Sequence, residues 1–494
     1  MNDHKAEIYY YDIGDYLNRE QKLNTISQFK SMENLPFTRI TSNEHGDWIS
    51  QRNDKFATWI PIEADKKFNS VSQSFFTMYS LGIATNKDYL LYDFGEEQLN
   101  NKVQKMVDFY NEQRILFYTE KIKSPSIDAR SFIKYDIKKI NWTDLFIRDL
   151  EKNQKYELDK QKFTIGMYRP FCKQRFIYEK QFLQRTYQQL SIFPTANHKN
   201  LVICVTGIGS TKVATALMTD MIPSLDYVEK SQCFPLYWYE TIEPKQHSLF
   251  GDDGAKIVRH DAISDFILNR AQQKYGNNVQ REDIFYYVYG ILHSKSYRET
   301  FSVDLKKMLP RIPLVSDYQK FWVFSEAGRS LASLHLNYEE VAPCPDVLVD
   351  SLKYAQYASD KQCVYGDGRM VAEPAPENRH KSEIDYNYYA VEQMKFPKKG
   401  EKGTILYNHW HTIKNIPEKA YEYVVNGKSA IEWIMERYAV TTDKKSGIKN
   451  DPNDWSREHR KPRYIMDLLL SIINVSAQTV DIVNGLPEVD WDKE

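Results

Sequence analysis

The chain has 494 residues, of which 42% are hydrophobic and 27% are charged, and its formal net charge is -1. This length predicts two to four domains with ordinary buried cores, and the near-neutral charge excludes a protein that coats nucleic acid indiscriminately. The sequence begins without an apolar signal core, and its five cysteines form no C-x-x-C pair. The most apolar stretch, residues 464–475, is too short to span a bilayer. We therefore expect a soluble cytoplasmic protein with reduced thiols.

The first predicted elements form a short N-terminal unit. Residues 8–11 predict a strand, and Asn18 predicts the N-cap of a helix that runs from Arg19 to about residue 31. Gln21 has the spacing that completes a capping box. A strand and a helix with nothing before them are typical of the end of a domain, so we interpret residues 1–60 as the tail of a larger domain and a linker.

The next region, residues 61–245, predicts a mixed α/β subdomain. Its apolar spacing indicates a helix from Glu96 to Arg114 and a short helix over 142–149. Runs of aromatic and β-branched residues predict strands. These strands are expected over 56–62, 75–81, 89–94 and 201–206.

The second half of the chain changes to helical spacing after a polar linker at about residues 243–254. Residues 255–341 predict a compact helical subdomain, and its third helix stops before Pro310 because proline disfavours a helical residue ahead of it. The predicted helices are 261–275, 281–292, 296–308 and 316–336. Residues 346–494 predict a smaller part with a strand at 403–407 and helices at 429–438 and 464–480. The expected fold class is α+β.

The charge of the chain is concentrated in one window, residues 160–215. This window has nine cations and one carboxylate, Glu179, which gives it a formal charge of +8. Aromatic side chains alternate with the cations, a pattern typical of nucleic-acid surfaces, where cations neutralise phosphates. The alternative is a basic face whose acidic partners lie elsewhere in the fold. The nine cations are Lys160, Lys162, Arg169, Lys173, Arg175, Lys180, Arg185, Lys199 and Lys212.

Candidate catalytic motifs are weak. The sequence from Gly207 to Lys212 follows a predicted strand, but the phosphate-loop spacing is absent, and a simple turn explains it better. His409 and His411 form half of a possible metal site, with no third ligand at recognisable spacing. The chain has no Pro-Pro dipeptide, which the adenine-binding loop of an amino-methyltransferase requires, and no Gly-rich turn for adenosylmethionine. We therefore expect no enzyme activity, metal or cofactor in this chain.

Several longer motifs resemble one known family. The sequence IYYYDIGDYLNREQKL at residues 8–23 looks like the junction that follows the methyltransferase core of Type ISP restriction–modification enzymes, the single-polypeptide Type I-like systems. The resemblance covers nearly the whole chain. It continues through Tyr168-Arg169-Pro170-Phe171, QCFPLY at 232–237, DIFYYVYGILH at 283–293, LPRIP at 309–313 and AYEYVVNG at 420–427.

The resemblance implies a target-recognition domain. Such enzymes combine a nuclease, an ATP-driven translocase and an adenine methyltransferase with a C-terminal domain that reads duplex DNA. This chain resembles that last domain plus the final strand and helix of the methyltransferase. S-adenosylmethionine, ATP and Mg²⁺ are therefore expected only for upstream domains. The expected partners are double-stranded DNA and a methyltransferase domain on the same or a separate polypeptide.

Joining the basic window to this resemblance gives a set of candidate DNA contacts. Cations are expected on phosphates, and amide side chains are expected at base edges in the major groove. Two other functions stay open, a protein–protein interaction module and an inactive remnant of a full-length enzyme. For Arg169, a structural clasp within the fold is a further alternative. The candidate residues are Arg169, Lys173, Gln174, Arg175, Arg185, Asn197 and Lys199.

Overall fold

A four-stranded antiparallel sheet lies at the centre of the protein and brings distant segments together. In its strand order, β4-β10-β8-β9, Cys233 of β10 pairs with Cys204 of β8, and Cys204 pairs with Leu217 of β9. The computed structural model describes residues 6–14, 17–49, 51–63, 73–242, 256–351 and 386–494. The strands of this sheet are β4 (Ser80–Leu81), β8 (Val202–Val205), β9 (Ala216–Thr219) and β10 (Gln232–Pro235).

A second sheet, β5-β7-β6, contains three of the nine cations of the basic window, Arg169, Lys173 and Arg175. Its strands are β5 (Tyr92–Asp93), β6 (Phe163–Arg169) and β7 (Cys172–Ile177). The remaining sheets are small and antiparallel. They are β1 (Ile8–Tyr10) with β2 (Thr38–Ile40), β3 (Ile60–Pro61) with β13 (Arg311–Ile312), β11 (Tyr237–Ile242) with β12 (Lys256–Asp261), β14 (Leu348–Ser351) and β15 (Ile405–Leu406) flanking β16 (His411–Lys414), β17 (Val424–Val425) with β18 (Lys428–Ser429), and β19 (Thr441–Thr442) with β20 (Lys449–Asn450).

The helices complete an α+β fold, which confirms the predicted class. They are α1 (Arg19–Gln28), α2 (Asp54–Thr58), α3 (Asp88–Leu91), α4 (Glu96–Lys123), α5 (Ala129–Phe132), α6 (Asp144–Glu151), α7 (Gln189–Ile192), α8 (Asp265–Tyr275), α9 (Arg281–His293), α10 (Lys295–Thr300), α11 (Asp304–Lys307), α12 (Tyr318–Leu336), α15 (Ala430–Arg437), α16 (Asn453–Glu458) and α17 (Tyr464–Asn484), with short 3-10 turns η1 (Met32–Asn34), η2 (Lys160–Lys162) and η5 (Glu418–Tyr421).

Most predicted helices are present, and the local signals that predicted them are visible. The Asn18 side chain accepts from the Gln21 amide (2.9 Å), and the Gln21 side chain accepts from the Asn18 amide (2.9 Å), so the capping box is confirmed. Helix α1 ends three residues earlier than predicted, and α4 extends nine residues beyond Arg114.

Four predicted elements are wrong in part. Of the strand predicted over residues 75–81, only β4 at residues 80–81 is formed. Residues 54–58 form helix α2 instead of the start of a strand, because the Asn53 side chain caps the turn and Phe56 is buried against aromatic neighbours. Residues 88–91 form helix α3 before the short strand β5. The single helix predicted over 296–308 is split into α10 and α11.

Helices α9 and α12 pack backbone against backbone. A Cβ atom on Gly290 would collide with the carbonyl of Phe324, and one on Gly328 would collide with the carbonyl of Tyr286. Only glycine allows this approach, because any side chain would force the two helices apart.

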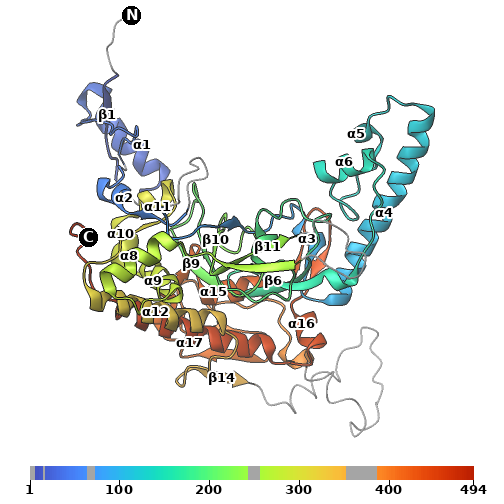
Figure 1. Cartoon of the computed structure of the whole chain (residues 1–494). Helices are drawn as coiled ribbons and strands as arrows, with labels where there is room; N and C mark the ends of the chain where they lie inside the picture. The colour runs from blue at the N-terminus through green and yellow to red at the C-terminus, as the bar shows by residue number, and fades with distance from the viewer. Residues whose placement is uncertain (1–5, 15–16, 50, 64–72, 243–255, 352–385) are drawn as a thin grey trace, which may run out of the picture.

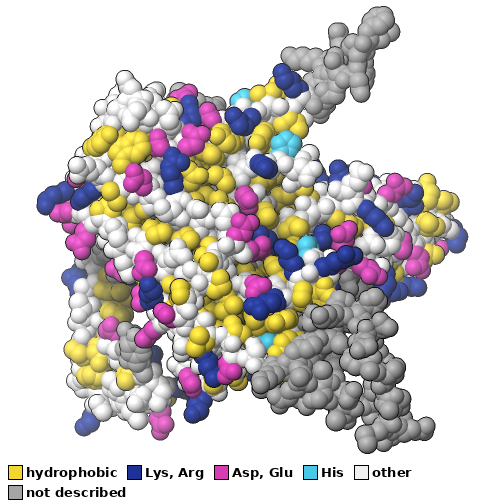
Figure 2. Space-filling view, turned by 90° about the horizontal axis from the view of Figure 1, so that it is seen from below, with side chains coloured by type: hydrophobic (Ala, Val, Ile, Leu, Met, Phe, Trp, Pro, Cys, Tyr) yellow, Lys and Arg dark blue, Asp and Glu magenta, His cyan; other side chains and the backbone are white. Residues whose placement is uncertain are grey.

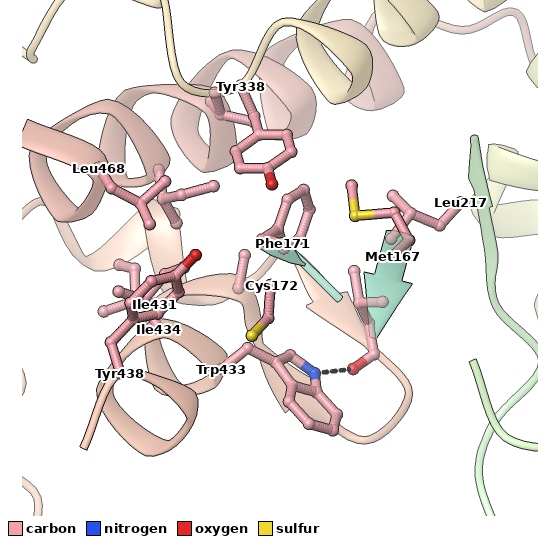
Figure 3. Packing of buried hydrophobic residues seen from close by; sticks show 14 of the residues in the cluster. Met167, Phe171, Cys172, Leu217, Tyr338, Ile431, Trp433, Ile434, Tyr438 and Leu468 are labelled. Atoms are coloured by element: carbon pink, nitrogen blue, oxygen red, sulfur yellow. Dashed lines mark hydrogen bonds between the residues drawn. The ribbon is translucent and has the colours of Figure 1, made fainter. Parts of the chain in front are cut away.

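Three hydrophobic cores hold the elements together. One joins β6, β7, β8 and β9 to α15 and α17, and Figure 3 shows Phe171, Cys172 and Met167 packed among Tyr338, Trp433 and Leu468. The Trp433 indole donates to the Val425 carbonyl (2.7 Å). A second core joins the other face of the central sheet to α8, α9 and α12, and a third lies under α4 and α6. The first two cores cross the predicted boundaries at residues 245–255 and 341–346, whose status as domain limits stays a prediction.

The cysteines within the described part of the chain are unpaired. Cys172, Cys204 and Cys233 are buried and free, and Cys344 is half-buried and free. Burial raises the pKa of the Cys172 thiol to about 12, so it stays protonated. The prediction of unpaired thiols is confirmed for these four, and Cys363 lies outside the described residues.

Two projections rise from the same side of the body (Figure 1). One is the N-terminal unit of β1, α1 and β2, and the other is the unit of α4, α5 and α6 at the opposite end. Helices α12 and α17 run along the other side of the body. Among the described helices, α17 alone is long and apolar enough to cross a membrane, but 72% of its most apolar window is buried in the protein. The expectation that this segment is too short is wrong, and its burial is typical of a core helix.

A buried hydrogen-bond chain connects the central sheet to three helices. The Met218 amide of β9 donates to the Tyr289 hydroxyl of α9 (3.0 Å). That hydroxyl lies 2.6 Å from His335 Nδ1 of α12, and His335 Nε2 lies 3.0 Å from Thr479 Oγ1 of α17. Burial is the main cause that holds the pKa of His335 well below its usual range, and the nearby His293 imidazole lowers this pKa as well. The imidazole is therefore neutral, so it accepts from Tyr289 and donates to Thr479.

Removing the Tyr289 hydroxyl should destabilise the fold. Tyr289→Phe leaves the Met218 amide and His335 Nδ1 buried without partners, so we expect a loss of about 1–3 kcal/mol in the free energy of unfolding. Urea denaturation followed by circular dichroism measures it. The control is Tyr286→Phe, on the same helix but half-exposed, which should change the free energy by less than about 0.5 kcal/mol. Equal losses in both variants would contradict the stabilising role assigned to the buried hydrogen-bond chain.

Stability should also fall in mild acid. Burial lowers the pKa of His293 to about 4 and holds that of His335 well below its usual range, whereas both titrate near about 6.5 in the unfolded chain. Below about pH 6.5 the unfolded state therefore binds protons that the folded state does not, and each His removes up to ~1.4 kcal/mol per pH unit.

The contribution of His293 to this loss can be measured separately. His293→Asn should weaken the dependence of the free energy of unfolding on pH between about 6.5 and 4.5, whereas exposed His409→Asn should keep it. Identical pH profiles for wild type and His293→Asn would show that the buried imidazole does not cause the acid sensitivity.

Candidate nucleic-acid interface

The turn between β6 and β7 lies in the first part of the basic window, between Arg169 and Lys173. Pro170 and Phe171 are its two turn residues, since Arg169 and Cys172 pair across it. Phe171 has φ = 55°, a left-handed conformation that usually favours glycine at this position of a turn after proline. The Phe171 ring is buried, edge-on to the Tyr338 ring at 5.3 Å and near His335. Burial of this ring offsets the backbone strain of about 1–3 kcal/mol.

Arg169 forms an internal clasp. Its guanidinium lies 3.2 Å from Asp88 of α3 and 3.8 Å from Asp226, and it donates to the Tyr168 carbonyl (2.7 Å) and the Ser224 hydroxyl (3.3 Å). The group is centred 4.0 Å from the Tyr168 ring. With 14% of its side chain exposed, Arg169 joins β6, α3 and the segment that follows β9, as the structural alternative for this residue anticipated.

Lys173 and Arg175 lie on one face of β7 and are also paired. Lys173 lies 3.1 Å from Glu339 and over the Tyr338 ring. Arg175 lies 3.2 Å from Glu96, at the start of α4, and 3.3 Å from Glu458, at the end of α16. Both cations are therefore tied to neighbouring elements.

Gln174 lies between them in sequence and faces the opposite side of β7, because side chains alternate along a strand. It is 2% exposed, and its Oε1 atom has no hydrogen-bond partner among the described residues. DNA contact by Gln174, Arg169, Lys173 and Arg175 stays a prediction, and in this structure all four serve internal contacts.

Arg185, Asn197 and Lys199 are exposed. The Arg185 backbone pairs with Ala84. Asn197 and Lys199 belong to a loop that is fixed against β11 by Tyr239. The Tyr239 hydroxyl donates to the Lys199 carbonyl (3.2 Å), and the Tyr239 ring packs against His198. The loop is thus held through its backbone, and both side chains are left accessible to a ligand.

The basic window therefore contains two kinds of cation. Arg169, Lys173 and Arg175 are neutralised by carboxylates that all come from outside the window. The other six are exposed, and within the described part of the chain no carboxylate lies within 4.0 Å of them. They are Lys160, Lys162, Lys180, Arg185, Lys199 and Lys212.

The weak catalytic motifs have structural explanations. The loop after β8 holds the Glu229 carboxylate, which accepts from Ser210 and Thr211 where a phosphate loop would hold its ligand. His411 is buried, bonded to Ser351 (2.7 Å) and stacked on Tyr389, whereas His409 is exposed. Burial lowers the pKa of His411 to about 4. No group of three potential metal ligands occurs in the described ranges.

Two exposed cations outside the window, Lys230 and Lys306, lie beside this loop. Lys230 Nζ donates to the Gly209 carbonyl (2.7 Å), and the Lys306 carbonyl accepts from the Gly209 amide (3.2 Å). Sequence reasoning missed them because acidic residues, Glu229 and Asp304, lie close to each in the chain, so no local excess of charge marks their positions.

Comparisons with known proteins agree on one family. Residues 74–468 match the Type ISP C-terminal specificity domain. Among solved structures, the chain is similar to a nuclease-deletion mutant of the Type ISP restriction-modification enzyme LlaGI in complex with a DNA substrate mimic, at 32% identity and a TM-score of 0.77, over 99% of this chain and 40% of that one.

Two further structures are similar. The ATP-dependent Type ISP enzyme LlaBIII bound to DNA has 34% identity and a TM-score of 0.78, over 98% of this chain and 28% of that one. A DrdV–DNA complex has 27% identity and a TM-score of 0.74, over 97% of this chain and 43% of that one. No curated protein matches the sequence. The chain spans less than half the length of the solved chains that it matches.

The family match covers most of the chain, and the matched structures share its architecture at more than 30% identity in two cases. This outcome confirms the resemblance inferred from the motifs. The chain belongs to the family of Type ISP C-terminal specificity domains.

Proposed function

We propose that this chain recognises a specific sequence in double-stranded DNA and so directs the other domains of a Type ISP restriction–modification enzyme. The observation that carries the proposal is the likeness, over nearly the whole chain, to two Type ISP enzymes whose structures contain DNA or a DNA mimic. The exposed cations of the basic window supply the charge that such a ligand requires.

The proposal assigns no catalytic step to this chain. Adenine methylation, DNA cleavage and translocation would belong to upstream domains, together with S-adenosylmethionine, ATP and Mg²⁺. The N-terminal unit supports contact with such a domain, because α1 has no buried residue and Tyr9, Leu23, Ile26 and Met32 are all about half or more exposed. We propose that residues 1–60 are the tail of a methyltransferase-like domain and a linker, and that this domain covers the unit of β1, α1 and β2. Such an enzyme would act in the cytoplasm.

The DNA surface follows from the distribution of exposed side chains. Arg185 and Lys199 would contact phosphates, and Asn197, beside Lys199, would reach a base edge, where an Asn amide pairs well with adenine. The ion pairs of Arg169, Lys173 and Arg175 would have to break before these residues could bind phosphate, and each break would leave a partly buried carboxylate (Asp88, Glu339 or Glu458) without its partner. We therefore propose that these three cations, with Gln174, shape the surface that Arg185, Asn197 and Lys199 present.

Selection from random duplexes tests this function. The purified chain should enrich one defined, asymmetric sequence from the pool, and the affinity should fall steeply between about 50 and about 150 mM salt, since phosphate contacts release counterions. Sequencing of the bound fraction identifies the site. Absence of binding at both salt concentrations would overturn the proposal. Salt-sensitive binding without enrichment would contradict sequence reading by this chain.

Charge removal tests the surface. The double variant Arg185→Gln/Lys199→Gln should reduce the slope of log K against log salt by about 2, because two phosphate contacts are lost. The control is Lys419→Gln/Lys461→Gln, which removes two exposed charges next to α17, where Lys419 pairs with Asp481 (2.8 Å). On that side of the protein, Lys and Arg side chains alternate with Asp and Glu (Figure 2), so the slope should stay unchanged. Equal slopes for both double variants would rule out Arg185 and Lys199 as contacts.

A further inference from the structure

The loop between β8 and β9, residues 207–213, has exposed apolar and cationic side chains that are not among the DNA contacts proposed around Lys199. Thr206 and Thr215 close the hairpin below it, through a bond from the Thr206 amide to the Thr215 carbonyl (3.0 Å) and one from the Thr215 amide to the Thr206 hydroxyl (3.0 Å). The loop begins where this hairpin leaves the central sheet, so its position is fixed by the core.

One carboxylate holds the inner side of the loop. Glu229 accepts from the Ser210 hydroxyl, the Thr211 amide (3.1 Å) and the Thr211 hydroxyl (3.2 Å). Desolvation alone would raise the pKa of Glu229, but hydrogen bonds from Ser210 and Thr211 lower it overall. This acidic group is therefore occupied within the fold.

The backbone of the loop is fixed to three other segments. The Gly209 amide donates to the Lys306 carbonyl of α11 (3.2 Å), and its carbonyl accepts from Lys230 Nζ (2.7 Å). The Asn426 side chain accepts from the Glu229 amide (3.2 Å), and the Asn426 amide donates to the Thr215 hydroxyl (3.1 Å). The groups at the tip are thus presented by an ordered frame, which lowers the entropy lost on binding a ligand.

The outer side of the loop combines apolar groups with cations. Ile208 is 51% exposed and Val213 is 58% exposed. Lys212, Lys230 and Lys306 are also exposed, and no carboxylate within the described ranges lies within 4.0 Å of any of the three. Exposed β-branched side chains close to exposed cations match a nucleic-acid groove, where apolar groups meet base edges and cations meet the flanking phosphates.

The location of the loop agrees with such a ligand. Lys307 of α11 lies 2.8 Å from Asp47, which follows β2, and α11 lies at the root of the N-terminal projection (Figure 1). The loop therefore stands beside the unit that a methyltransferase domain would cover. DNA that passes from the specificity domain to a methyltransferase would run close to this junction.

We propose that loop 207–213 is a second DNA-contacting element of this domain, with Lys212 and Lys306 on phosphates and Ile208 and Val213 against the groove between them. The inference rests on the proposed DNA-binding function and adds a site apart from the one around Arg185, Asn197 and Lys199. Lys230, whose ammonium group already bonds Gly209, braces the loop.

Photocrosslinking tests the contact directly. A benzoylphenylalanine at position 208 of the full chain should crosslink to a labelled pool of random duplexes at about 50 mM salt, a concentration that favours phosphate contacts. The matched control carries the same group at position 323, because Val323 is a β-branched residue of α12 with a similar exposed fraction, 41%. Position 323 should give no crosslink.

The outcomes separate this proposal from the proposed function. If the position-208 protein binds the pool but does not crosslink, or crosslinks no more than position 323, the loop is not a DNA contact and the proposed function stands. If the unsubstituted chain does not bind the pool, the proposed function itself fails. As a second measurement, Lys212→Gln/Lys306→Gln should reduce the salt slope by about 2, and an unchanged slope would overturn their role on phosphates.

Discussion

The hydrogen-bond chain from Met218 through Tyr289 and His335 to Thr479 is the interaction on which the arrangement of this domain depends. It joins the edge strand of the central sheet to α9, α12 and α17 with buried partners at every step. A buried polar group without a partner is costly, so this set of contacts strongly favours one relative placement of sheet and helices. The strands that present loop 207–213 and the segment that contains Lys199 are thereby held in one frame.

Electrostatics divides the basic window into a structural and an exposed part. Arg169, Lys173 and Arg175 tie the β6–β7 hairpin to α3, α4, α16 and the turn after α12 through carboxylates from distant parts of the chain. Their charges are largely neutralised, so they add little to the long-range attraction of DNA. The charges of the exposed lysines and Arg185 are not neutralised in this way, so their electric field extends into the solvent. One strongly basic sequence segment thus contains both cations that stabilise the fold through ion pairs and cations that stay exposed at the surface.

Sequence signals that depend on neighbours a few residues away predicted helices correctly. Features that depend on contacts between distant parts of the chain were not predicted. The capping box at Asn18 and the helical spacing of α9 and α12 depend on neighbours a few residues away, and both are confirmed. The strand predicted at residue 56 is wrong because aromatic composition favours a strand, whereas contacts with Tyr297 and Phe301 favour the helical turn. The sequence marked the cations of the window but could not reveal that Glu339 or Glu458 faces them. Whether the candidate residues touch DNA is decided by exposure, which depends on the whole fold.

The contact of Gly290 with Gly328 has a consequence for how such a domain can change its target. The α9–α12 pair excludes every side chain at two positions, so this part of the frame tolerates almost no substitution. The loops that carry Asn197, Lys199 and Ile208 are attached through backbone bonds and leave their side chains unconstrained. Under the proposed function, new recognition sequences would arise by exchange of a few loop residues, while the scaffold that positions these loops stays fixed.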